Sequence, residues 1–223
     1  MTVAIRDAAS VMVVRRHAAG ASVLMGMRGA GAAFMPSKFV FPGGAVDPED
    51  GHVALARPLG TTCHARLLQE DGVSPDAIAA AALRELAEET GLLIGRPGGP
   101  PCDWPGHAGA ILTPDAAPLI YMFRAITPPG RPRRFDAHFF VADAVDIAGD
   151  PDDFSAACDE LSHLHWVPLD QAGALDLPFI TEVVLAELSA LIRDLAHDKP
   201  LSPPATVPFF DNRGPAPVFR QLR

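Results

Sequence analysis

Short runs of alternating apolar and polar residues predict β-strands along much of the chain. Residues 10–16 and 22–28 are rich in β-branched and apolar side chains, and the small or polar residues 17–21 join them, which predicts a hairpin. A short strand is expected to end at Val40-Phe41, where a Pro-Gly-Gly turn begins. Later runs predict three further strands, at residues 119–126, 137–142 and 165–167. We expect the strand at 165–167 to be the last in the chain.

A helical period replaces this alternation in the middle of the sequence. From Pro75 to Thr90 the apolar residues recur at the spacing of one helix face. Ser74 is the expected N-cap, and Gly91 is the expected end of the helix. Other patterns predict helices at residues 169–175 and 181–197, a loop rich in Pro and Gly at 96–109, and a Pro-rich tail at 200–223 that cannot form a regular helix. We therefore expect an α/β fold in a single domain, residues 1–223.

Three glutamates share one side of the predicted helix at residues 75–90. Glu85 and Glu89 are i,i+4 neighbours, and Glu88 lies three positions after Glu85, so the three side chains project from a common face. We call these three residues the glutamate cluster. Carboxylate oxygens are the ligands that Mg²⁺ and Mn²⁺ prefer, so the cluster predicts a divalent-metal site. The alternative interpretation is a solvated helix face, which is common for glutamate. The apolar positions favour the metal site because they lie in a separate sector: residues 79, 82, 83, 86 and 90.

The cluster and the turn at Phe41-Pro42-Gly43-Gly44 together resemble the Nudix box, G-x5-E-x7-R-E-U-x-E-E-x-G-U with U aliphatic. The second half of the box matches at every specified position: Arg84, Glu85, Leu86, Glu88, Glu89, Gly91 and Leu92. The first half departs from the pattern, because Gly44 precedes Arg84 by 40 positions, where the usual box has about 14. We therefore expect an insertion at residues 47–74. The first glutamate of the box falls at Asp76 when counted back from Arg84, or at Asp50 when counted on from Gly44.

The insertion is similar to that of one branch of the Nudix hydrolases, which includes a mammalian peroxisomal diphosphatase of coenzyme A and acyl-CoA. Two further segments resemble this branch, Phe34-Met35-Pro36 and residues 132–140. Coenzyme A-cleaving relatives also carry a pattern ahead of the box, of which Leu24, Arg28 and the Phe-Pro-Gly-Gly turn match. Gly26, Ala33 and Ser37 depart from that pattern.

The resemblance implies a Nudix-type α/β/α sandwich with a mixed sheet and a catalytic loop-helix-loop that carries the insertion. The implied activity is metal-dependent hydrolysis of a diphosphate that links a nucleoside to a second group. Coenzyme A or acyl-CoA is the expected substrate, with Mg²⁺ or Mn²⁺ as cofactor and 3′,5′-ADP and (acyl-)phosphopantetheine as products. ADP-ribose, a nucleotide sugar or a dinucleotide is an alternative substrate, and a non-catalytic nucleotide-binding module is an alternative function. An isoprenoid diphosphate isomerase shares the fold but needs a catalytic cysteine, for which the sequence has no evident motif.

The resemblance also assigns expected roles to single residues. Glu85, Glu88 and Glu89 are the expected metal ligands, and Arg84 is expected to brace Glu88 and leave Glu85 and Glu89 for metal. Glu85 or Glu160 is the expected general base, and Glu88 belongs to the expected catalytic set with them. The expected substrate contacts are Arg28, Phe34, Gly43, Gly44 and Arg134, whereas His138, between phenylalanines, is interpreted as structural.

Composition narrows the function classes further. The 223-residue chain is 48% hydrophobic and has a formal net charge of −9, which excludes a disordered chain and argues against non-specific nucleic-acid binding. Its three cysteines form no C-x-x-C pair, so neither a zinc site built on cysteines nor a disulfide framework is predicted. The absence of a long apolar run, of a signal-peptide layout and of a Ser-Lys-Leu ending predicts a cytoplasmic enzyme with no membrane partner. A homodimer is expected as a possible assembly from the family resemblance.

Overall fold

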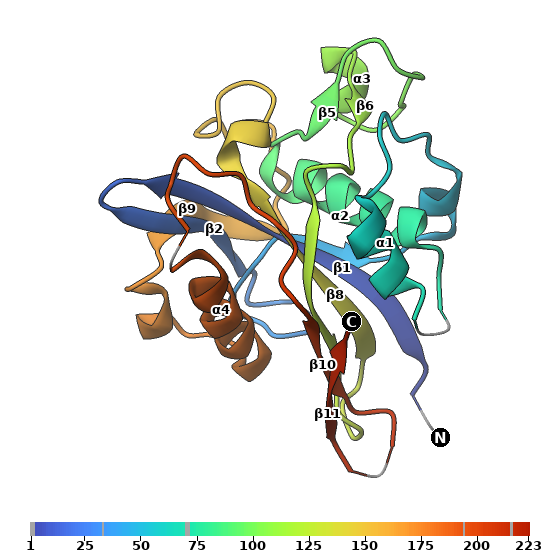
Figure 1. Ribbon diagram of the computed structural model, residues 1–223, viewed down its shortest axis with the longest axis vertical. Coiled ribbons are helices and arrows are strands. Elements are labelled where there is room, and N and C mark those ends of the chain that lie inside the picture. The colour runs from blue at the N-terminus through green and yellow to red at the C-terminus, as the bar shows by residue number, and fades with distance from the viewer. Residues whose placement is uncertain (1–2, 33, 70–71, 194, 215) are drawn as a thin grey trace.

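A mixed β-sheet with helices on both faces forms the centre of the molecule (Figure 1). The computed structural model describes residues 3–32, 34–69, 72–193, 195–214 and 216–223. Within these residues nine strands form the main sheet, and β5 and β6 form a separate two-stranded sheet. No helix in these ranges is both long enough and apolar enough to cross a membrane.

The main sheet combines parallel and antiparallel pairs around β1. β1 lies parallel to β8 along one edge, and its other edge pairs antiparallel with β4 and then with β2. The strand order is β11-β10-β7-β8-β1-β2-β3, and β9 adds to β2. The strands are β1 (Ile5–His17), β2 (Gly20–Arg28), β3 (Phe39–Val40), β4 (Gly43–Ala45), β7 (Ile120–Ile126), β8 (Arg134–Asp143), β9 (Leu161–Pro168), β10 (Val207–Asp211) and β11 (Val218–Leu222).

Each face of the sheet carries its own hydrophobic core. Alternation along β1 sends Val11 and Val13 into the core beneath α1 (Thr61–Leu67) and α2 (Pro75–Thr90). It sends Met12 and Val14 into the core beneath α4 (Phe179–Ile192) on the opposite face. This arrangement confirms the predicted α/β/α sandwich. The continuous apolar run at residues 11–14 of β1 is typical of a strand that is buried on both faces.

α2 has the boundaries that its sequence predicts. Pro75 occupies the first turn, and Gly91 ends the helix in the left-handed conformation at φ 76°. Ser74 is the N-cap residue, as predicted, although its side chain makes no capping hydrogen bond. Four consecutive alanines, residues 79–82, are fully buried and bring the helix backbone close to the sheet.

The other predicted elements need corrections of detail. The β1–β2 connection is a tight turn in which His17 pairs with Gly20, because both strands extend into the segment expected to be a loop. Residues 169–175 hold only the 3₁₀ turn η3 (Ala172–Ala174), and α4 begins two residues before the predicted start and ends at Ile192. The segment expected to be a loop at 96–109 ends in the short helix α3 (His107–Ala110), and β5 (Gly95–Arg96) and β6 (Thr113–Pro114) bracket it. A further 3₁₀ turn, η2 (Ala144–Asp146), follows β8.

The C-terminal tail completes the sheet, so β9 is not the last strand. β10 pairs parallel with β7, and β11 pairs antiparallel with β10 at the edge of the sheet (Figure 1). Prolines exclude helix in the tail but leave extended backbone available, and Val207 and Phe209 are fully buried. The predicted Pro-rich tail is therefore an integral part of the sandwich.

The insertion consists of the 3₁₀ turn η1 (Pro48–His52), an extended stretch and α1. α1 begins at Thr61 and ends at Leu67. Cys63 and Leu67 of α1 join the core that also contains α2, so the insertion packs against the catalytic side of the sheet. Residues 70 and 71 of the insertion lie outside the described residues.

Candidate active site

Arg84 holds two members of the glutamate cluster. Its Nη1 donates to Glu85 Oε1 at 2.8 Å and to Glu88 Oε2 at 3.2 Å. Arg84 contacts Glu88, as expected, and it contacts Glu85 as well. The guanidinium is flanked by both carboxylates because neighbouring and i,i+4 positions can both reach it.

Asp50 holds the other side of the Arg84 guanidinium. Arg84 Nε donates to Asp50 Oδ1 at 2.9 Å, and Nη2 donates to Oδ2 at 3.0 Å. Asp50 is 1% exposed, whereas Asp76, the other candidate for the first acid of the box, is exposed in the first turn of α2. Asp50 is therefore the residue that joins the two halves of the interrupted box. Counting on from Gly44 identifies it, because Asp50 lies in the first turn of the insertion.

Glu89 is the most deeply buried member of the cluster. The Gly43 N–H donates to Glu89 Oε2 at 2.7 Å, while Oε1 is buried and has no hydrogen-bond partner among the described residues. Burial raises the pKa of Glu89 to about 8, and the nearby Glu85 carboxylate acts in the same direction. The Gly43 N–H and the Arg28 guanidinium oppose this shift. A carboxylate that is 2% exposed is not part of a solvated helix face.

Gly44 provides the space that Glu85 occupies. A β-carbon at Gly44 would lie 2.4 Å from the Glu85 carboxyl carbon, much closer than van der Waals contact. Burial raises the pKa of Glu85, and Arg84 opposes the shift through its charge and its hydrogen bond. The two glycines of the turn thus have separate tasks, since Gly43 supplies an N–H to Glu89 and Gly44 supplies room for Glu85.

Arg28 and Glu160 reach the cluster from neighbouring strands. Arg28 pairs with Leu161 in the β2–β9 ladder, which brings the adjacent Glu160 to the same end of the sheet. The charge of Glu160 raises the pKa of both Glu85 and Glu89, and that of Arg28 lowers the pKa of Glu89. Arg28 Nε is buried without a hydrogen-bond partner in the described part of the chain. The structure therefore brings these two candidates together with the cluster.

The donor set of the cluster fits a hard divalent cation. It offers carboxylate oxygens only, and the buried Glu89 Oε1 has no hydrogen-bonding partner among the described residues. The three carboxylates are not gathered around one point, because Arg84 holds Glu85 and Glu88 while Gly43 holds Glu89. Among the described residues, the only compact group of possible metal ligands lies elsewhere, at Asp7, Asp136 and His138.

Two expected substrate contacts lie in other surroundings. Arg134 is buried, and its Nε and Nη2 donate to the carbonyl oxygens of Thr127 and Asn212 at 2.9 and 2.8 Å. It joins the β7–β8 connection to the C-terminal tail, which indicates a structural role for these two nitrogens. Phe34 packs edge-on against Phe135 at a centroid separation of 5.2 Å, which attaches the β2–β3 loop to the sheet.

No protein-family model and no curated protein sequence matches this chain. Among solved structures, a Nudix hydrolase from Alicyclobacillus acidocaldarius is similar at a TM-score of 0.65 and 30% identity, over 91% of this chain and 100% of that chain. The Nudix domain of Shewanella oneidensis NrtR, complexed with ADP ribose, is similar at a TM-score of 0.50 and 12% identity, over 84% of this chain and 88% of that chain. The second likeness concerns the fold alone. The first structure is 30% identical to this chain and is covered over its whole length. The chain therefore belongs to the Nudix hydrolase family.

Proposed function

We propose that this Nudix pyrophosphohydrolase cleaves coenzyme A or acyl-CoA at the diphosphate, with Mg²⁺ or Mn²⁺ held by Glu85, Glu88 and Glu89. The observation that carries the metal assignment is Glu89, whose buried Oε1 has no partner among the described residues, next to two further carboxylates. A buried carboxylate of this kind is costly unless a cation pairs with it. When bound, the ion neutralises diphosphate oxygens and lowers the pKa of a bound water.

The protein groups around the cluster have distinct proposed roles. Arg84, anchored by Asp50, orients the Glu85 and Glu88 carboxylates toward a common ligand. The Gly43 N–H fixes the rotamer of Glu89 through its 2.7 Å hydrogen bond. Gly43 and Gly44 therefore act on the substrate through the glutamates that they position.

Glu160 is the proposed general base. Glu85 already accepts a hydrogen bond from the permanently charged Arg84, which weakens it as a proton acceptor. Glu160 is exposed and lies close enough to raise the pKa of Glu85 and Glu89. An exposed carboxylate beside the metal ligands can take a proton from the attacking water and release it to solvent.

Arg28 is the proposed contact for a substrate phosphate. Its guanidinium has an unpartnered buried Nε among the described residues and lies near Glu89, and arginine binds phosphate through paired hydrogen bonds. The coenzyme A assignment rests on Leu24, Arg28 and the Phe-Pro-Gly-Gly turn, which match the pattern of coenzyme A-cleaving relatives. Phe34 remains a proposed contact for the adenine or the acyl chain.

ADP-ribose is the second candidate substrate. Ala33 and Ser37 depart from the coenzyme A pattern, and a structural neighbour, the Nudix domain of NrtR, was solved with ADP ribose.

The cytoplasmic location and the homodimer stay predictions.

The test is a panel of diphosphates offered to the purified protein with Mg²⁺ or Mn²⁺. Coenzyme A, acetyl-CoA, ADP-ribose and a dinucleoside polyphosphate are incubated separately, and the products are separated by chromatography. We expect 3′,5′-ADP and 4′-phosphopantetheine from coenzyme A. Good turnover of ADP-ribose without cleavage of coenzyme A would reject the coenzyme A assignment and retain the diphosphatase.

Two carboxylate-to-amide variants on α2 test the metal assignment. Glu89→Gln should remove nearly all turnover, whereas Asp76→Asn, an exposed position on the same helix, should keep wild-type rates. Circular dichroism serves as the control that both variants are folded. Wild-type turnover in Glu89→Gln would reject the glutamate cluster as the metal site.

A further inference from the structure

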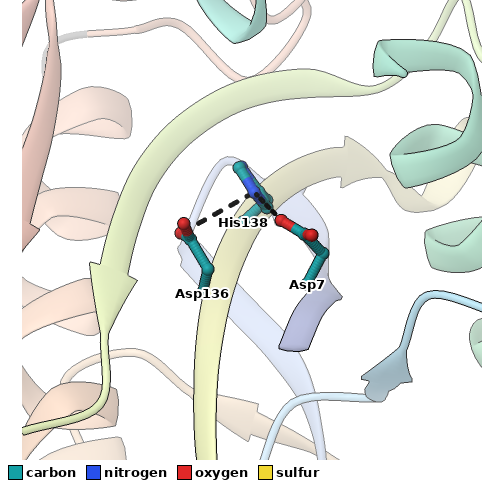
Figure 2. A group of neighbouring side chains, drawn as sticks. All are labelled: Asp7, Asp136 and His138. Carbon is teal, nitrogen blue, oxygen red and sulfur yellow. Dashed lines mark ion pairs between the residues drawn. The ribbon is translucent and has the colours of Figure 1, made fainter. Parts of the chain in front are cut away.

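Asp7, Asp136 and His138 converge on one point between two central strands (Figure 2). Asp7 comes from β1, and the other two come from β8, where Asp136 pairs with Asp7 and His138 pairs with Ala9. His138 Nε2 lies 3.6 Å from Asp7 Oδ1 and 3.8 Å from Asp136 Oδ1. One ligand atom from each residue lies within 4.8 Å of the other two.

These separations are too long for hydrogen bonds and are close to those of metal ligands. Hydrogen bonds between nitrogen and oxygen span about 2.7–3.2 Å. Two ligand atoms that each lie about 2.1 Å from one ion at a tetrahedral angle are about 3.4 Å apart. The Asp7 side chain is 23% exposed, so it has room to move by the few tenths of an ångström that would complete such a site.

His138 presents a buried nitrogen without a hydrogen-bond partner toward the two carboxylates. The side chain is 3% exposed, and its Nε2 has no hydrogen-bond partner among the described residues. Its Nδ1 lies 3.2 Å from the Tyr121 hydroxyl. In one tautomer the Tyr121 hydroxyl donates to Nδ1, and Nε2 carries the proton. With Nδ1 instead donating its proton to that hydroxyl, the Nε2 lone pair faces two carboxylates, and a cation between them stabilises that tautomer. Metal-binding histidines commonly have their other ring nitrogen fixed in this way.

Arg124 supplies the second support that a metal site requires. It donates to both oxygens of Asp136, at 2.8 and 2.7 Å, and so fixes the orientation of that carboxylate. Each carboxylate oxygen retains another lone pair for a second partner. Arg124 balances the charge of one aspartate, so with a neutral His138 the group keeps one net negative charge. A partly buried negative charge next to an imidazole nitrogen favours a divalent ion.

We propose that Asp7, Asp136 and His138 bind one divalent transition-metal ion, preferentially Zn²⁺, at a site separate from the glutamate cluster. One imidazole nitrogen and two carboxylate oxygens suit Zn²⁺, whereas Mg²⁺ prefers oxygen alone. Ala9 pairs with Gly44 on one edge of β1 and with His138 on the other. Two strand spacings, about 10 Å, therefore separate the backbone of His138 from that of Gly44, beside Glu85. The ion cross-links β1 and β8, the parallel pair at the centre of the sheet.

The site is tested in the full-length protein after the glutamate cluster has been disabled. In the variant Glu85→Gln/Glu88→Gln/Glu89→Gln, equilibrium dialysis against Zn²⁺ with elemental analysis should give about one ion per chain. Adding His138→Gln should lower the Zn²⁺ affinity at least 10-fold. Adding His165→Gln, an exposed histidine in β9, should leave the affinity unchanged. No bound Zn²⁺ in the parent variant, or equal affinity after His138→Gln, would overturn the site.

Two further measurements distinguish the proposed ligands from a cysteine site and from a loss of folding. Asp7→Asn changes a partly exposed side chain and leaves the Asp136–Arg124 pair intact, so it tests the site even where His138→Gln does not fold. It should also lower the affinity at least 10-fold. The Co²⁺-loaded parent variant should show ligand-field bands without a thiolate charge-transfer band. A thiolate band would assign the bound ion to a cysteine and reject the proposed ligands, and so would unchanged affinity in Asp7→Asn.

Discussion

Arg84 and Asp50 form a buried, two-bonded ion pair across 34 positions of sequence. The pair connects α2 to the first turn of the insertion, and the same guanidinium continues to Glu85 and Glu88. The insertion can therefore extend between Asp50 and Pro75 without separating the two halves of the active site.

Asp50→Asn should destabilise the protein and reduce turnover. The substitution keeps the size of the side chain but leaves the Arg84 guanidinium, 11% exposed, without its main counter-charge. Breaking one partner of a buried pair costs about 3–5 kcal/mol of the free energy of unfolding. Urea unfolding measures this loss, and Asp76→Asn is the matched control with no expected change. An equal loss in both variants would contradict the assignment of Asp50 as the first acid of the box.

Gly44→Ala should reduce turnover strongly while the fold persists. The added methyl group would lie 2.4 Å from the Glu85 carboxyl carbon and would force that side chain out of place. Displacement of a metal ligand by about 1 Å is expected to lower kcat about 100-fold. Gly51→Ala is the control, because its β-carbon would meet only Ala77 at 3.8 Å. Steady-state kinetics and thermal unfolding are measured on both variants. A normal kcat in Gly44→Ala would show that displacement of Glu85 does not impair catalysis.

Glu89→Gln should stabilise the metal-free protein, and more so at high pH. The pKa of Glu89 is raised from 4.5 to about 8 in the folded state, so the folded protein binds more protons than the unfolded chain between these values. Wild-type stability should therefore fall as the pH rises from about 5 to about 8, and the glutamine variant should lack this contribution. Urea unfolding in a chelator at pH 5 and pH 8.5 measures the difference between the two proteins. A difference that is equal at both pH values would mean that the pKa of Glu89 is not raised.

Arg28→Ala should impair turnover, whereas Arg134→Ala should impair stability. Loss of a charge-assisted bond to a phosphate costs about 1.5–3 kcal/mol, so Arg28→Ala should lower kcat/KM about 10- to 100-fold with little change in melting temperature. Arg134→Ala should lower the melting temperature and keep KM, because its bonds go to the Thr127 and Asn212 carbonyls. Kinetics and thermal unfolding are measured on both variants. A raised KM in Arg134→Ala would restore it as a substrate contact.

The sequence by itself determined the features that rest on local physical chemistry. The 3.6-residue period and Gly91 defined α2 at Pro75–Thr90, and the i,i+4 spacing placed the glutamate cluster on one face. Alternation predicted the strands around β1, and the resemblance to the Nudix box implied the sandwich. These signals are reliable because each depends on residues only a few positions apart.

Only the tertiary structure decided the features that depend on distant partners. Asp50, not Asp76, binds Arg84, and Arg134 binds the C-terminal tail. Hydrogen bonds across the fold, not local spacing, select these partners. The pairing of β10 with β7 was not predicted, because the prolines of the tail interrupt the strand pattern. Asp136 and His138 share one face of β8, and Asp7 joins them only through the parallel pairing of β1 and β8. A strand's sequence shows which side chains share a face, and the neighbouring strand determines what those side chains meet.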